Sequence, residues 1–134
     1  MTPRTARPGW IGRARLGAAA LLLIAAVAPA GCASLPPARA ITDINMVAGR
    51  WRGQIAFSRG PYELFYLTIN PEGTLVASWA SATRYGKVTL EGARARFSVY
   101  IWSGTLDYLE GGGERVILLK EDFGHWDALV RPLS

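Results

Sequence analysis

Cysteine and histidine are scarce in this 134-residue sequence, which contains one of each, Cys32 and His125. A single cysteine excludes an internal disulfide and a cysteine-based metal cluster. One histidine beside two turn acids, Asp122 and Asp127, is poor material for zinc, so we expect no metal and no cofactor. A loose calcium site built from Glu121, Asp122 and Asp127 stays open as an alternative.

Motifs for catalysis are also lacking. No G-x-S-x-G segment supplies a nucleophilic serine on a strained turn, and a solvated or capping role is expected for His125. The glycine run at 111–113 is followed by neither Lys nor Ser/Thr, which excludes a phosphate-binding loop. We therefore predict a protein that is not an enzyme and has no catalytic residue.

Acidic residues are absent from the first 40 positions. The chain has 15 basic and 10 acidic residues and a net charge of +5, and five arginines at positions 1–40 account for all of the excess. Residues 41–134 are consequently neutral overall. A domain without a basic surface has no electrostatic footprint for DNA or RNA, so no nucleic-acid partner is expected.

One long hydrophobic run is present, at Leu16–Ala28, and it follows four arginines. A basic head before a short apolar core is typical of a secretory signal. The run is shorter than the about 20 residues that span a bilayer, and Pro29 interrupts it. An uncleaved membrane anchor remains an alternative, because the uncharged stretch continues to Ala38.

The end of this run, Ala30-Gly31-Cys32, resembles the lipobox of bacterial lipoproteins. In that family the cysteine is diacylated on sulfur and becomes the new N-terminus. The resemblance implies a signal peptide at 1–31, a lipidated Cys32 with a linker at 32–40, and a membrane anchor in the cell envelope. Ala33 is similar to the residue that directs such proteins to the outer membrane of Gram-negative bacteria, facing the periplasm.

Pro29 stands where the lipoprotein family usually has Leu. Residues 28–30, Ala-Pro-Ala, also fit the A-x-A form that precedes ordinary signal cleavage. A soluble periplasmic or secreted protein is therefore the alternative to a lipid-anchored one.

No helical periodicity follows Gly49. Thr42 or Asp43 is expected to cap a short helical turn, and polar and apolar residues then alternate with the period of two that is typical of strands. Eight strands are predicted, at residues 50–58, 62–69, 74–82, 87–91, 94–102, 105–109, 115–121 and 126–131. The expected fold of domain 41–134 is all-β, a small antiparallel meander that closes as a barrel or half-barrel or folds as a sandwich.

The residues Gly49-Arg50-Trp51 after the short helical turn resemble the Gly-x-Trp start of the lipocalin and calycin barrels. In that family the tryptophan plugs the closed end of the barrel, and an arginine late in the chain stacks over it. The resemblance implies a lipocalin-like barrel with Trp51 in this position and Arg131 as the arginine. The alternative role of Trp51 is that of an ordinary core aromatic.

Aromatic side chains remain as the candidate site. One set is expected on the inward faces of the strands and is the candidate for ligand binding: Trp51, Phe57, Trp79 and Phe97. A second set is expected on the opposite faces and is the candidate partner surface: Tyr62, Tyr66, Tyr100 and Trp102. Filling the core alone is the alternative role of the inner set, and the two sets exchange roles if the sheet curls the other way.

Two functions follow from this set of features. The first is a lipid-anchored envelope protein that binds a small apolar ligand or lipid. The alternative is a module that interacts with another envelope protein, because the layout is similar to that of small eight-stranded lipoprotein barrels that inhibit periplasmic proteases or lysozyme.

Overall fold

The computed structural model describes residues 34–80 and 82–133. The predicted signal peptide, lipobox and Cys32 lie outside the described residues. The described elements are β1 (Ala38–Arg39), the 3₁₀ helix η2 (Ile44–Met46), β2 (Gly49–Phe57), β3 (Tyr62–Ile69), β4 (Thr74–Trp79), β5 (Ala82–Glu91), β6 (Arg94–Val99), β7 (Trp102–Gly111), β8 (Glu114–Glu121) and β9 (Trp126–Pro132). In this part of the chain no helix has the length and apolar character to cross a membrane.

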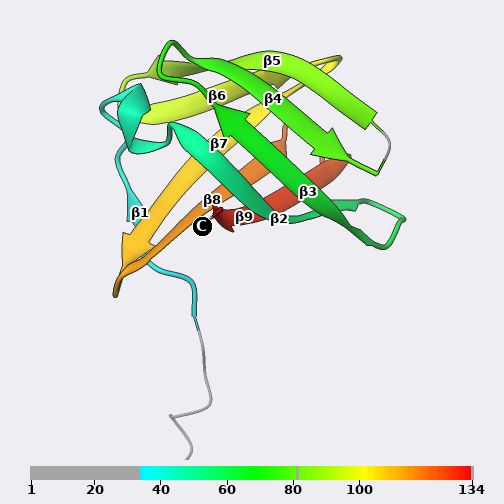
Figure 1. Cartoon of the computed structure of the whole chain (residues 1–134), viewed down its shortest axis with the longest axis horizontal. Helices are drawn as coiled ribbons and strands as arrows, with labels where there is room; N and C mark the ends of the chain where they lie inside the picture. The colour runs from blue at the N-terminus through cyan, green and yellow to red at the C-terminus, as the bar shows by residue number, and fades with distance from the viewer. Residues whose placement is uncertain (1–33, 81, 134) are drawn as a thin grey trace, which may run out of the picture. The chain divides into compact units, whose positions relative to one another are not determined.

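Strands β2 to β9 form a closed barrel. Each strand pairs antiparallel with the next along the chain, and β9 pairs back onto β2 (Figure 1). The predicted all-β antiparallel meander is thus confirmed, and of the predicted alternatives the closed barrel is the one observed. Closure leaves none of these eight strands with a free edge along its whole length.

Two strand boundaries differ from the prediction. The turn expected at 85–86 lies instead between Trp79 and Ala82, and the turn expected at 103–104 lies at Tyr100–Ile101. Both short hairpin connections use a residue with positive φ, Ala80 at 46° and Tyr100 at 54°. Such turns usually carry Gly, Asn or Asp. The two strand boundaries were predicted wrongly because Ala and Tyr are not residue types that indicate a turn.

The chain before β2 also joins the barrel. Asp43 caps η2, and its carboxylate accepts the N–H of Asn45 at 2.9 Å. Strand β1 pairs with Tyr108 and Leu109 of β7, next to the stretch of β7 that pairs with β6. Ala38 and Arg39, which the sequence places in the linker, are thus part of the sheet.

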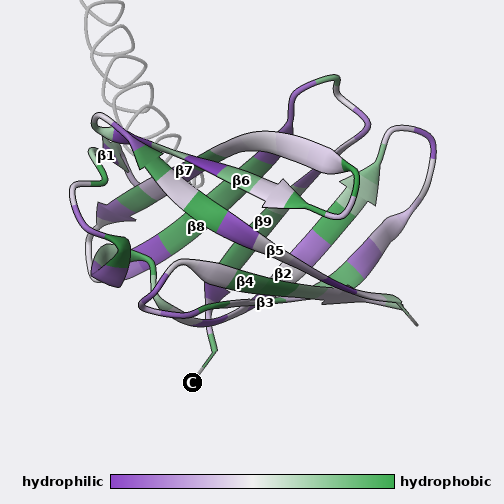
Figure 2. Cartoon of the chain, turned by 90° about the horizontal axis from the view of Figure 1, so that it is seen from above, coloured by the Kyte–Doolittle hydropathy of each residue, from purple (hydrophilic) through white to green (hydrophobic). Residues whose placement is uncertain are grey.

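The inside of the barrel is filled by side chains. Hydrophobic and hydrophilic residues alternate along the strands (Figure 2), and the inward residues form one continuous cluster of 20 buried side chains. An eight-stranded barrel has an interior just wide enough for such filling. Trp51, Phe65 and Phe97 are its largest fully buried members.

Candidate functional site

The two ends of the barrel differ in chemistry. We call the end that holds η2 and the turn at 112–113 the helix end. We call the other end, with the turns at 58–61, 100–101 and 122–125 and the turn that includes Ala80, the aromatic end. Before β1 the chain lies at the helix end, where the carbonyl of Pro37 accepts the N–H of Glu110 at 3.1 Å.

Trp51 closes the helix end. Its indole N–H donates to the carbonyl of Val47 at 2.9 Å, and the guanidinium of Arg115 lies over its ring, 5.1 Å from the centroid. The arginine implied for this place, Arg131, is elsewhere. It lies opposite Arg52 on the outer face of the barrel and bonds Glu114 at 2.9 Å. Successive side chains of β9 point to opposite faces of the sheet, and Val130 points inward, so the adjacent Arg131 points outward.

Arg115 also organises the polar groups beside Trp51. Its side chain donates to the carbonyl of Met46 at 3.0 Å and to the hydroxyl of Tyr108 at 3.0 Å. That hydroxyl donates in turn to the carboxylate of Glu110. Burial, together with the bond to Glu110, raises the pKa of Tyr108, so its hydroxyl stays protonated at neutral pH. The helix end is therefore a closed, hydrogen-bonded structure.

Four rings pack together at the aromatic end. Trp102 lies 6.3 Å from Phe57, 5.9 Å from Trp79 and 6.0 Å from Trp126, measured between ring centroids. Phe57, Trp79 and Trp102 are half-buried and pack against the core. Their outer edges leave an apolar rim on the barrel.

Trp102 is a correction to the predicted outer set. The sequence continues one strand from 94 to 102, which points Trp102 outward. In the structure the chain turns at Tyr100–Ile101, and Trp102 lies opposite Val99 on the neighbouring strand. Directly opposed residues share a face of the sheet, so Trp102 faces inward with Val99.

The predicted inner set is divided between the two ends. Phe57 and Trp79 belong to the aromatic end, and Phe97 packs beneath it, 5.3 Å from Trp126. Trp51 lies at the helix end. The four residues therefore do not line one common site.

The turns of the aromatic end carry exposed apolar side chains. Tyr100 is 60 %, Ile101 75 % and Phe123 84 % exposed. Tyr100 is held from two sides: the guanidinium of Arg84 lies 4.6 Å from its ring centroid, and Trp102 meets it edge to face at 5.5 Å. Ile101 and Phe123 are not among the predicted site residues, because the strand predicted at 94–102 includes Ile101 and the periodicity of the strands does not cover Phe123.

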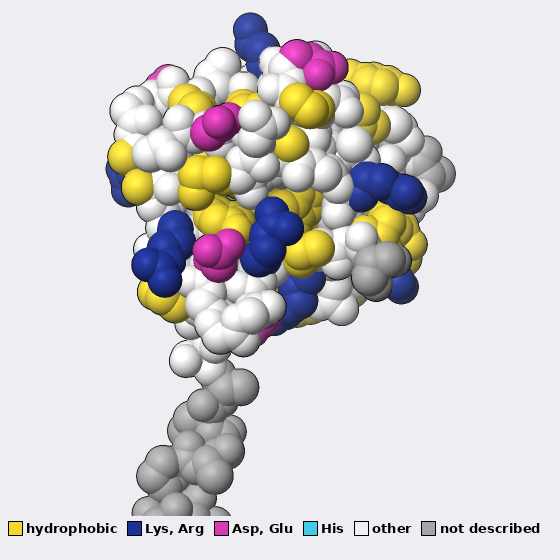
Figure 3. Space-filling model, turned by 60° about the vertical axis from the view of Figure 1, so that its left-hand side comes forward, with side chains coloured by type: hydrophobic (Ala, Val, Ile, Leu, Met, Phe, Trp, Pro, Cys, Tyr) yellow, Lys and Arg dark blue, Asp and Glu magenta, His cyan; other side chains and the backbone are white. Residues whose placement is uncertain are grey.

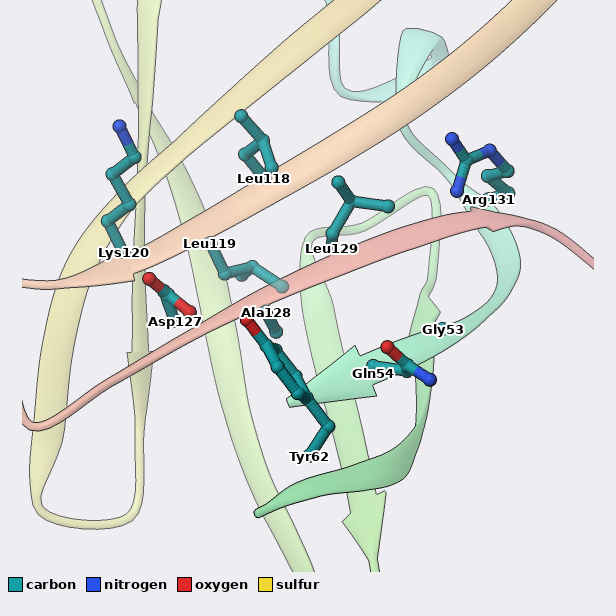
Figure 4. A pocket seen from close by; sticks show the side chains of 10 residues that line it. All are labelled: Gly53, Gln54, Tyr62, Leu118, Leu119, Lys120, Asp127, Ala128, Leu129 and Arg131. Carbon is teal, nitrogen blue, oxygen red and sulfur yellow. The ribbon is translucent and has the colours of Figure 1, made fainter. Parts of the chain in front are cut away.

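Tyr62 extends this apolar surface along the outside of the barrel. It is 72 % exposed and borders a hollow of about 470 Å³ over β2, β8 and β9. Figure 4 shows Leu118 and Leu129 in this hollow, with Lys120 and Arg131 towards opposite ends. The last member of the predicted partner surface, Tyr66, lies farther along β3, where Arg52 faces its ring at 5.9 Å.

The turn that displays Phe123 is built around a buried carboxylate. Glu121 is 6 % exposed. It accepts the backbone N–H groups of Phe123 at 3.1 Å and of His125 at 3.0 Å, and it contacts His125 Nδ1 at 2.7 Å. Burial alone would raise the pKa of Glu121, but these contacts outweigh it and the pKa is lowered.

Charges of both signs lie close together on one face of the molecule (Figure 3). On the face drawn in Figure 3, basic, acidic and hydrophobic side chains are interspersed. Within residues 34–80 and 82–133, no three His, Cys, Asp or Glu side chains are grouped so that they could hold a metal ion. The turns of the aromatic end carry three exposed apolar side chains, those of Tyr100, Ile101 and Phe123.

Comparison with known proteins assigns neither a family nor a function to this chain. No protein-family model matches the sequence, no curated protein matches it, and no solved structure matches the fold.

Proposed function

We propose that this protein is a lipid-anchored protein of the bacterial cell envelope that binds a protein partner through the aromatic end of its barrel and has no enzymatic activity. The observation that carries the proposal is the position of the exposed apolar side chains. Tyr100, Ile101 and Phe123 stand on turns at the end opposite Pro37, where the chain enters the barrel. An anchor ahead of Pro37 therefore leaves this end free to meet a partner.

The composition of the aromatic end fits a protein interface. Tyr, Trp and Arg dominate the energetics of such interfaces, and here Tyr100 packs between Arg84 and Trp102. Large apolar side chains that are held in place lose little conformational entropy on binding. We propose a calycin-like barrel that offers these side chains to an apolar cleft of its partner. A periplasmic protease or a lysozyme is the class of partner that provides such a cleft.

The test uses the full chain in its host envelope. Formaldehyde crosslinking is expected to give an adduct of defined mass, and Ile101→Ser and Phe123→Ser are each expected to reduce it at least about tenfold, since losing an apolar anchor costs about 1.5–3 kcal/mol. Leu90→Ser is the matched control, because Leu90 is also exposed but lies near the turn between β5 and β6 at the helix end. An adduct that all three variants retain equally contradicts the proposal.

A second function, binding of a small apolar ligand or lipid, is favoured by one observation. Phe57 and Trp126 border a hollow of about 460 Å³ at the aromatic end, beside the half-buried ring of Trp102. Because the interior is filled, such a ligand would bind at this rim. Adding a fatty acid should then change the tryptophan fluorescence of the protein, and a flat titration across fatty acids and phospholipids would rule this function out.

A further inference from the structure

Glu121 is a buried charged side chain that is not part of the hydrophobic core cluster. Its side chain is 2 % exposed, while the adjoining His125 is 62 % exposed. Burying a carboxylate is costly unless hydrogen bonds compensate, so this charge must be stabilised by its surroundings. Its position at the end of β8, directly before the turn that carries Phe123, links it to the aromatic end.

The bonds of Glu121 determine the shape of that turn. One carboxylate oxygen accepts the N–H groups of both Phe123 and His125, and the other accepts that of Phe123 as well. The chain therefore curls around the carboxylate, and the side chain of Phe123 is left pointing into solvent at 84 % exposure. Charge-assisted bonds of this kind are about twice as strong as neutral ones.

The other charged groups around the turn do not duplicate this role. Arg96 binds the carboxylate of Asp122, which holds the first turn residue to β6. Lys120 and Asp127 border the same hollow as Glu121 and are exposed. Among the described hydrogen bonds, Glu121 alone accepts the amides of Phe123 and His125 through a side chain.

We infer that Glu121 is the positioning residue of the partner-binding surface, and that its buried carboxylate holds residues 122–125 in the conformation that presents Phe123 to the partner. This inference rests on the proposed function. It adds that binding depends on a residue that the partner does not touch, through the order of one turn.

The experiment compares Glu121→Gln with Asp127→Asn in the full chain. Glutamine keeps the volume of Glu121 but removes its charge and one acceptor oxygen. Two readouts are needed: hydrogen exchange of the segment containing the amides of residues 123 and 125, and the yield of the formaldehyde adduct in the envelope. For Glu121→Gln, exchange should accelerate about tenfold, since hydrogen bonds to a charged acceptor are lost, and adduct yield should fall. Asp127→Asn should change neither readout.

A double-variant cycle separates positioning from a general loss of stability. If Glu121 acts through Phe123, then Glu121→Gln should reduce the adduct no further in a Phe123→Ala background. Exchange of the β2 and β3 amides should stay slow in both variants, which shows that the barrel remains folded. If Glu121→Gln unfolds the barrel, Glu121→Asp replaces it, since a shorter carboxylate keeps the charge while its oxygens are withdrawn from the amides.

The outcomes are distinct. Faster exchange of the turn with an unchanged adduct, or unchanged exchange in Glu121→Gln, overturns the inference. If Phe123→Ser removes the adduct and Glu121→Gln does not, the proposed function stands without Glu121. If neither substitution affects the adduct, the proposed function itself fails.

Discussion

Two arginines late in the chain, Arg115 and Arg131, provide a direct comparison of a partly buried and an exposed cation. Arg115 covers the ring of Trp51 and donates to Met46 and Tyr108, whereas Arg131 makes an exposed ion pair with Glu114. Arg115→Ala should lower the free energy of unfolding by about 2–3 kcal/mol, since it removes two hydrogen bonds and a cation–π contact. Arg131→Ala should lower it by less than about 1 kcal/mol. Urea unfolding of the two variants checks this order, and equal losses would contradict it.

A pH dependence also belongs to the residue scale. Because the pKa of Glu121 is lower in the folded protein than its ordinary value, ionised Glu121 stabilises the fold. That stabilisation is fully present above the ordinary glutamate pKa of about 4.3 and is lost as the pH falls through the lower folded value. The groups around it are His125, the Asp122–Arg96 pair, Lys120 and Asp127.

Urea unfolding between pH 7 and pH 3 measures this contribution. The native protein should lose stability below about pH 4, and Glu121→Gln should lose less over the same range. Identical pH profiles for the two proteins would show that the buried carboxylate is not linked to folding.

At the scale of the strand, the backbones of β2 and β9 approach so closely at Gly53 that only glycine fits there. A Cβ at Gly53 would overlap the carbonyl oxygen of Leu129 on β9, while a Cβ at Gly60, in a turn, would meet only Phe57 at 3.9 Å. Gly53→Ala should therefore cost about 2 kcal/mol or more through overpacking. Gly60→Ala should change stability by no more than about 0.5 kcal/mol. Urea unfolding decides, and a tolerated Gly53→Ala would mean that β2 and β9 separate easily.

The sequence predicted some strand boundaries correctly and others wrongly, and the wrong ones lie at closely packed glycines. Strands β2 and β3 were predicted almost to the residue, because apolar and polar residues alternate along β2 and clear turn residues bound both strands. The turns at 85–86 and 103–104 were placed wrongly, because Gly86 and Gly104 looked like turn residues. In the structure they lie within strands, where a Cβ would strike the carbonyl oxygens of Ser98 and Lys120.

The candidate site was predictable only in part. Periodicity indicated that Phe57 and Trp79 face inward, and that Tyr62 faces outward. Trp102 was assigned to the wrong face because Tyr100 turns the chain without glycine. The buried position of Glu121 gave no signal in the sequence, since its contacts depend on how the chain after β8 folds back.

At the scale of the whole molecule, the chain enters the barrel at the helix end, opposite the turns that carry Tyr100, Ile101 and Phe123. Strand β1 ties Ala38 and Arg39 to β7, so about five residues, at most about 18 Å of extended chain, separate Cys32 from the barrel. Strand β7 spans ten residues, about 33 Å along the strand, and its first residue, Trp102, lies at the aromatic end. If Cys32 is acylated, the helix end lies near the bilayer and the aromatic end lies away from it.

Fluorescence quenching tests this orientation. In proteoliposomes with headgroup spin-labelled lipid, a fluorophore attached through Leu90→Cys should be quenched more than one attached through Ile101→Cys. Adding Cys32→Ala to either variant should abolish quenching, because the anchor is lost. Equal quenching at the two positions would contradict this orientation.

The turns of the aromatic end have a further consequence for how such a protein changes over evolutionary time. Leu133 bonds Arg50 at the helix end, so the chain both enters and leaves the barrel there. The four turns at the opposite end are local connections between neighbouring strands, and exposed turns tolerate substitution and insertion. Descendants of one gene can therefore acquire a new surface at this end by altering these turns while inheriting the barrel itself unchanged.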